Sequence, residues 1–151
     1  MTQKREPWIK FYFADWRAEP RLKLCSRAAR SFWFDLLGIM HEARPYGFLM
    51  VEGIAPSVKQ LANLTGDPEK LVRQWMEELL RAGVPSIAGQ AMPDDVRELV
   101  PDDVPAGTWL SRRMVRDANK RALASVYGKM GGGNPALSGD AIKDDAKGPP
   151  L

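Results

Sequence analysis

Apolar residues recur at helical spacing over a long stretch in the first third of the chain. The spacing predicts a helix over residues 26–43, in which Ser26 is suited to cap the first turn. Pro45 ends it, because proline removes a backbone donor and disfavours helical geometry in the preceding residue. The predicted buried face consists of Ala28, Ala29, Phe32, Trp33, Leu36, Leu37 and Met40.

Two further apolar stripes lie close together and predict a helix, a tight turn and a second helix. Ser57 is suited to cap a helix over residues 58–64, and Gly66 to end it. Asp67 and Pro68 open the second helix, with proline in the first turn, and Gly83 terminates it. Its predicted buried stripe consists of Leu71, Val72, Trp75, Met76, Leu79 and Leu80.

Short β-prone segments surround these helices. Residues 8–13 predict a strand or extended arm, residues 15–22 a short helix that breaks or restarts at Pro20, and residues 46–51 a strand. Residues 84–87 and 108–114 predict two antiparallel strands joined by an insertion over residues 88–107. The predicted fold class is therefore α+β, a mainly helical winged helix-turn-helix with a small antiparallel β-hairpin wing.

The composition favours one domain with irregular ends, since the chain has 151 residues, of which 44% are hydrophobic and 27% charged. A last helix is predicted over residues 115–130 and a flexible tail over residues 131–151, which places the domain at residues 1–130. Cys25 is the single cysteine, so no internal disulfide and no zinc site is expected, and no cofactor. No apolar stretch suits a signal peptide or a membrane span, so we expect a cytoplasmic protein without a membrane partner.

The formal net charge of +3 makes nucleic acid a plausible partner, and the distribution of charge adds to this. The outward face of the second helix carries Lys70, Arg73 and Gln74, residue types that contact base edges and phosphates in a major groove. Lys59 and Gln60 on the preceding helix are candidates for backbone contacts. The alternative is an ordinary solvated surface, because Glu69, Glu77 and Glu78 share the second helix.

A basic run follows the second predicted wing strand. It predicts phosphate contacts with strong salt dependence, and the alternative is a solvated helix. Its candidate DNA-binding residues are Arg112, Arg113, Arg116, Lys120 and Arg121.

The insertion, in contrast, is acidic, and phosphates would repel it, so we do not expect the wing tip to lie on DNA. It is either a solvated insertion or a patch that docks a basic partner protein. The candidate partner-binding residues are Asp94, Asp95, Glu98, Asp102 and Asp103.

Aromatic and catalytic residue types need separate interpretation. Five tryptophans could stack on unpaired bases, but Trp33, Trp75 and Trp109 fall at positions expected in the core. His41 is the single histidine, near a helix end, where such a residue more often caps or packs. No triad, metal-ligand or carboxylate-pair spacing emerges, and residues 131–133 lack the Lys-Ser/Thr of a phosphate-binding loop. We therefore expect a protein that is not an enzyme.

Several blocks resemble the N-terminal winged-helix domains of phage and prophage replication-initiator, or replisome-organiser, proteins. They lie at residues 8–12, 24–30, 41–43, 45–47, 111–117 and 131–135, and the Ser-Arg-Arg-Met-Val-Arg-Asp block at 111–117 is the most specific. The resemblance reaches to about Leu137. It implies origin DNA binding in a bacterial host cell and, through a further C-terminal region, recruitment of a replicative helicase. The acidic insertion departs from the family, and the end at Leu151 suggests a fragment or a stand-alone relative.

The leading hypothesis is thus a module of a phage or prophage replication initiator that binds double-stranded DNA, with a homodimer as one possible state. Two alternatives stay open. The first is a phage-encoded interaction or inhibitor protein that grips a host protein through the same fold, with the acidic insertion as the contact. The second is a winged-helix transcriptional regulator, which shares the DNA chemistry and differs in the site bound.

Overall fold

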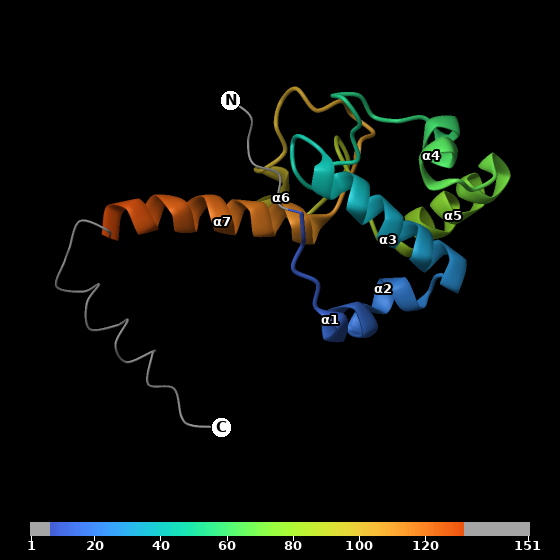
Figure 1. Cartoon of the computed structure of the whole chain (residues 1–151), viewed down its shortest axis with the longest axis horizontal. Coiled ribbons are helices and arrows are strands. Elements are labelled where there is room, and N and C mark those ends of the chain that lie inside the picture. Colours follow the sequence, from blue (N-terminus) through green and yellow to red (C-terminus); the bar gives the residue numbers. More distant parts are fainter. Residues whose placement is uncertain (1–6, 132–151) are drawn as a thin grey trace. The chain divides into compact units, whose positions relative to one another are not determined.

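The computed structural model describes residues 7–131, and helices make up most of their regular structure (Figure 1). By its internal contacts, the chain divides into two compact units, Met1–Arg116 and Asp117–Leu151. In chain order the elements are α1 (Phe13–Ala18), α2 (Pro20–Lys23), α3 (Arg27–Glu42), α4 (Val58–Thr65), α5 (Glu69–Ala82), β1 (Ser86–Ile87), α6 (Asp94–Arg97), β2 (Trp109–Leu110) and α7 (Arg112–Gly131). The mainly helical character with a small antiparallel sheet, an α+β composition, is as the sequence predicts.

The long helix α3 confirms the prediction for residues 26–43. Ser26 caps it, and its Oγ accepts a hydrogen bond from the backbone N–H of Ala29 at 3.1 Å. Ala43 is the C-cap of α3 and lies two residues before Pro45. The side chains that α3 buries are Ala29, Phe32, Trp33, Leu36 and Met40. Leu37 is half-buried, and the prediction that Ala28 is buried is wrong, because it is exposed.

Helices α4 and α5 are two consecutive helices separated by a tight turn, as predicted, and α5 contacts both α3 and α4 (Figure 1). Gly66 adopts a left-handed φ of +77° between them, and its N–H donates to the carbonyl of Ala62 at 2.9 Å. Pro68 is the residue before the first turn of α5 rather than a member of it, which corrects the predicted start.

The buried stripe of α5 is narrower than predicted. Val72 and Leu79 are fully buried, and Trp75 packs its ring 5.7 Å from that of Phe32. Leu71 and Leu80, however, are 38% and 42% exposed. They lie at the edges of the stripe that faces α3 and α4, so the prediction that they are buried is wrong.

The β structure is shorter than predicted, although its pairing is correct. Ser86 lies opposite Leu110 and Ile87 opposite Trp109 in an antiparallel ladder. Residues 46–51 form isolated bridges instead of a strand: Phe48 pairs with Leu110, and the N–H of Leu49 donates to the carbonyl of Trp109 at 2.8 Å. Segment 48–49 and β1 therefore flank β2 on its two sides.

Two other predicted boundaries are wrong. Of the two alternatives predicted for residues 8–13, a strand or an extended arm, the strand is not formed among the described residues, and Phe13 already begins α1. Helix α7 begins at Arg112 rather than Val115, since the Oγ of Ser111 accepts a hydrogen bond from the N–H of Met114 at 3.3 Å and caps the first turn. Arg112 and Arg113 thus lie on a helix and not on a wing strand. The predicted tail at 131–151 falls, after Gly131, outside the described residues.

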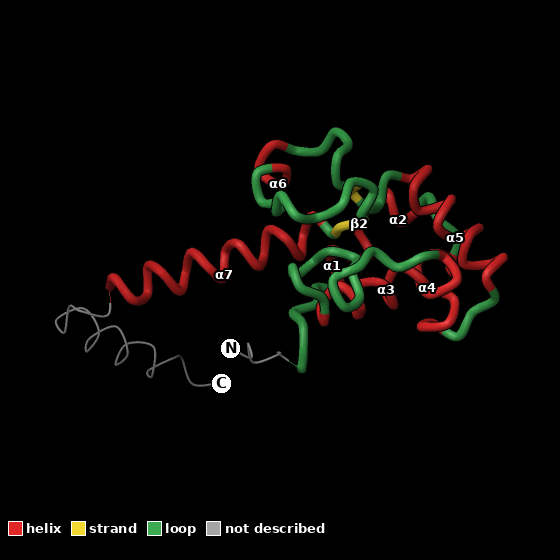
Figure 2. Tube along the Cα trace, turned by 90° about the horizontal axis from the view of Figure 1, so that it is seen from above, coloured by secondary structure: helices red, strands yellow, loops and turns green. Residues whose placement is uncertain are grey.

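The insertion between β1 and β2 has a folded interior, and Figure 2 shows α6 within the loop that leaves and rejoins the strand pair. Val96 of α6 is fully buried, in a cluster with residues of the sheet region and of α7. The expectation of a solvated insertion thus holds for its acidic side chains and fails for its apolar ones. The cluster consists of Phe48, Met50, Ala88, Val96, Val104, Leu110 and Val115.

Candidate nucleic-acid interface

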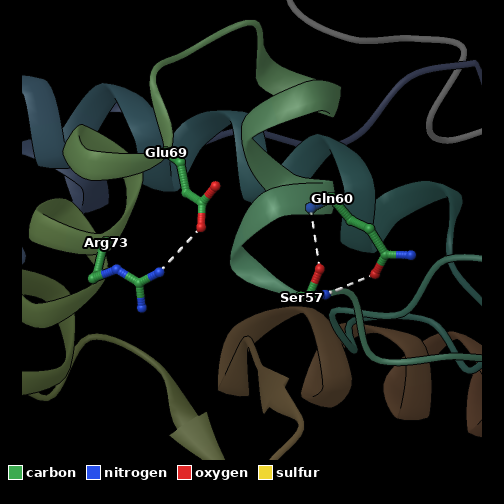
Figure 3. Close-up of polar contacts among 4 residues, drawn as sticks. All are labelled: Ser57, Gln60, Glu69 and Arg73. Carbon is green, nitrogen blue, oxygen red and sulfur yellow. Dashed lines mark hydrogen bonds and ion pairs between the residues drawn. The ribbon is translucent and has the colours of Figure 1, made fainter.

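The start of α4 is fixed by local hydrogen bonds (Figure 3). The Oγ of Ser57 accepts from the N–H of Gln60 at 3.2 Å, and the Oε1 of Gln60 accepts from the N–H of Ser57 at 2.8 Å. This capping box occupies the side-chain oxygen of Gln60, a predicted DNA contact, although the residue remains exposed. Lys59, next to it on α4, is also exposed.

The predicted contact residues of α5 all lie on its exposed surface: Lys70, Arg73 and Gln74. The guanidinium of Arg73 forms an ion pair with Glu69 at 3.1 Å, and both side chains are about half exposed (Figure 3). Helix α5 carries three basic and three acidic residues, so it has no net charge. Its outward face therefore carries hydrogen-bonding groups but has no net positive charge that would attract phosphates over a distance.

Arg112 is held by protein groups at the start of α7. It donates to the Oγ of Ser86 at 2.9 Å and to the carbonyl of Gly83 at 3.4 Å. Burial lowers the pKa of Arg112 from its ordinary value, and the charge of Arg21 adds to this. These contacts join α7 to the end of α5 and to β1, so Arg112 positions the elements around it.

The next two arginines of α7 pair with carboxylates far away in the sequence. Arg113 lies 2.8 Å from Asp15, and its guanidinium stands 4.8 Å from the ring centre of Tyr12. Arg116 donates to both oxygens of Asp95, at 2.8 and 3.2 Å. This hydrogen-bonded pair raises the pKa of Arg116 and lowers the pKa of Asp95.

Lys120 and Arg121 belong to the second unit, where both are exposed on α7. The whole of α7 carries six basic residues and one acidic residue. Arg112, Arg113 and Arg116 belong to the first unit. The five candidates of the predicted basic run therefore all lie on one helix, and the arginines of its first turns are engaged by protein groups.

The acidic residues of the insertion are exposed around its buried interior. Asp95 pairs with Arg116, and Asp94 pairs with Arg97 within α6. Glu98, Asp102 and Asp103 are exposed. The side chain of Asp95 therefore neutralises one of the cations predicted for DNA, which the sequence reasoning did not foresee.

The residues with catalytic potential are engaged structurally. The Nδ1 of His41 lies 2.9 Å from the hydroxyl oxygen of Tyr46. Burial raises the pKa of the Cys25 thiol, as does the charge of Glu78, so this thiol is a poor nucleophile at neutral pH. Within residues 7–131, no three His, Cys, Asp or Glu side chains gather where a metal ion could bind, and no helix is long and apolar enough to cross a membrane.

Sequence reasoning overlooked one surface. Aromatic side chains from residues 8–16 gather with Phe34 of α3, and several of them are exposed. The density of aromatic residues at 8–13 is the available signal, although the same run also predicts a strand or an extended arm.

Comparison with protein-family models found no match, and comparisons with curated proteins and with solved structures found no significant similarity.

Proposed function

We propose that the chain is a DNA-binding domain of the winged-helix type that acts in phage or prophage replication. The observation that carries this proposal is the order of the elements: α3, an extended segment, α4, a tight turn, α5 and the β1–β2 pair. The extended segment and β1 lie on opposite sides of β2. A winged helix has this order, since two helices joined by a tight turn are followed by a β-hairpin.

In the proposed complex, α5 enters the major groove. Lys70 and Arg73 reach base edges or phosphates, and Gln74 is suited to adenine. Arg73 exchanges Glu69 for a DNA group on binding, because the ion pair is exposed and weak. Lys59 and the amide nitrogen of Gln60 contact the backbone.

The positive charge of α7 supplies the attraction that α5 lacks. Arg113 and Arg116 exchange their carboxylate partners for phosphates, and Lys120 and Arg121 of the second unit bind phosphates as well. Arg112 keeps its bonds to Ser86 and Gly83 and serves the complex by positioning α7. The replication role itself rests on the resemblance to initiator domains, and a transcriptional regulator would use the same chemistry at another site.

A salt titration of duplex binding, followed by fluorescence anisotropy, tests this function. Replacing Lys120 and Arg121 together by alanine should reduce the slope of log affinity against log salt by about 2. Arg97→Ala is the matched control, because it removes an exposed arginine from the acidic insertion. Undetectable duplex binding at low salt would refute the proposal. So would an equal reduction of the salt slope in the Lys120, Arg121 double variant and in the Arg97→Ala variant.

The acidic insertion supports a second candidate, a phage-encoded protein that binds a host protein. Its Glu98, Asp102 and Asp103 are exposed, and the neighbouring Val96 and Val104 are buried, so the acidic side chains extend from a packed segment. Replacing these three residues by lysine should abolish capture of a basic host partner and leave duplex binding intact or stronger. Loss of duplex binding in this variant would contradict the separation of the two surfaces.

A further inference from the structure

Aromatic rings from the N-terminal segment and α3 form an ordered, exposed cluster in the first unit. The ring of Phe11 lies 5.1 Å from that of Phe13, 5.4 Å from that of Trp16 and 5.4 Å from that of Phe34. Phe13 is 71% exposed, and Phe34 and Tyr12 are each about half exposed. Contiguous exposed apolar side chains, unlike single ones, are typical of a binding surface.

The cluster is held in place from beneath. Trp16 and Phe11 are half-buried, and Trp16 packs against the main hydrophobic core. Phe34 extends from α3, and its ring meets that of Phe11 in an edge-to-face arrangement. The exposed rings are therefore preorganised, so that a planar ligand can stack on them without a large loss of side-chain entropy.

The surrounding segment is strongly basic. Residues 7–30 carry six basic and two acidic residues, a net charge of +4, whereas residues 31–111 carry six basic and twelve acidic residues. Lys10 and Arg17, both exposed, lie within this segment beside the aromatic residues. Arg113 stands over Tyr12 and pairs with Asp15, so its charge is offset by that carboxylate and it is not counted among the cations of this surface.

We propose that this surface binds single-stranded nucleic acid by stacking unpaired bases on Phe13 and Phe34. Lys10 and Arg17 neutralise the adjacent phosphates. Exposed aromatic faces combined with cations are the features that bind single strands without sequence preference, because every base has a π-face. A second copy of this chain fits less well, because two segments of charge +4 repel each other.

This inference goes beyond the proposed function, since duplex binding is assigned to α4, α5 and α7. A domain that holds duplex DNA on one surface and an unpaired strand on another can stabilise DNA that has been locally opened. Stabilising opened DNA needs both surfaces, whereas duplex binding and single-strand binding can each be measured separately.

The test is the affinity of the full chain for a short oligothymidylate, measured by anisotropy. Replacing Phe13 and Phe34 together by alanine should lower the affinity at least about fivefold, because stacking contributes about 1–3 kcal/mol per base. Phe13→Trp should keep or raise the affinity. Tyr127→Ala is the matched control, because it removes a similarly exposed aromatic ring from α7. Unchanged helical circular dichroism verifies that the variants are folded.

Three results would overturn the proposal. The first is oligothymidylate binding that is absent or insensitive to the alanine changes. The second is full affinity in a Phe13→Leu, Phe34→Leu variant, which would indicate an apolar protein-docking surface. The third is equal affinity for an abasic oligomer, which has phosphates but no bases. Duplex binding by the same variants should stay unchanged, so a failure here is distinct from a failure of the proposed function.

Discussion

Replacing Val96 by alanine is expected to destabilise the whole domain by about 1.5–3 kcal/mol. Its side chain is fully buried in α6 and packs in the cluster that includes Phe48 and Leu110. The change deletes two methyl groups, each contributing about 0.8 kcal/mol by burial, and the cavity left behind adds a further cost. For a chain of this size the loss corresponds to a melting temperature lower by roughly 5–10 °C.

The effect should reach the whole domain because the cluster is shared. Leu110 belongs to β2, where it pairs with both Ser86 and Phe48, so loosening the insertion weakens the sheet. Urea unfolding followed by tryptophan fluorescence is a suitable assay, because the neighbouring Trp109 is buried in the other core cluster. The midpoint should fall while the slope stays the same.

The matched control is Val126→Ala. Val126 is 54% exposed on α7, so the same chemical change should alter stability by no more than about 0.5 kcal/mol. An unchanged tryptophan midpoint in the Val96→Ala variant would refute the reasoning, because the insertion would then unfold independently of the sheet.

Three other changes follow from single contacts. Ser57→Ala should cost about 1 kcal/mol in urea unfolding, because it removes the cap of α4, whereas Ser125→Ala, on an exposed helical site, should cost little. Arg112→Met should cost about 1–3 kcal/mol in the same assay, because it leaves buried hydrogen-bond partners unsatisfied. Arg116 lowers the pKa of Asp95, so the stabilisation by this pair should be complete above the ordinary aspartate range and lost only as the pH falls below it. An NMR titration of the Asp95 carboxyl group should therefore have a midpoint below about 3.9, and a normal or higher midpoint would contradict the ion pair.

The helices of the first unit were predictable because their signals are local. The Ser26 and Ser57 caps, the apolar spacing of α3 and the turn at Gly66 all lie within a few residues of the structure they specify. The early start of α7 was also signalled locally, by Ser111 in a capping position.

What the sequence could not predict depends on residues far apart in the chain. The bridge between Phe48 and Leu110 exists only after the helices have packed, so the apolar run at 46–51 could not reveal its own pairing. Arg113 and Asp15 are 98 positions apart, and no pattern in the sequence announces their ion pair. In the insertion, the isolated valines between acidic residues gave no helical or strand period, although Val96 and Val104 are core residues.

The duplex-binding surface can be mapped most directly by titrating isotope-labelled protein with duplex DNA at low salt and following the backbone amide signals by NMR. The account predicts that the largest shifts occur at Lys70, Arg73 and Gln74 of α5 and at Arg113 and Arg116 of α7. Shifts confined to the acidic insertion, or none at all, would contradict it.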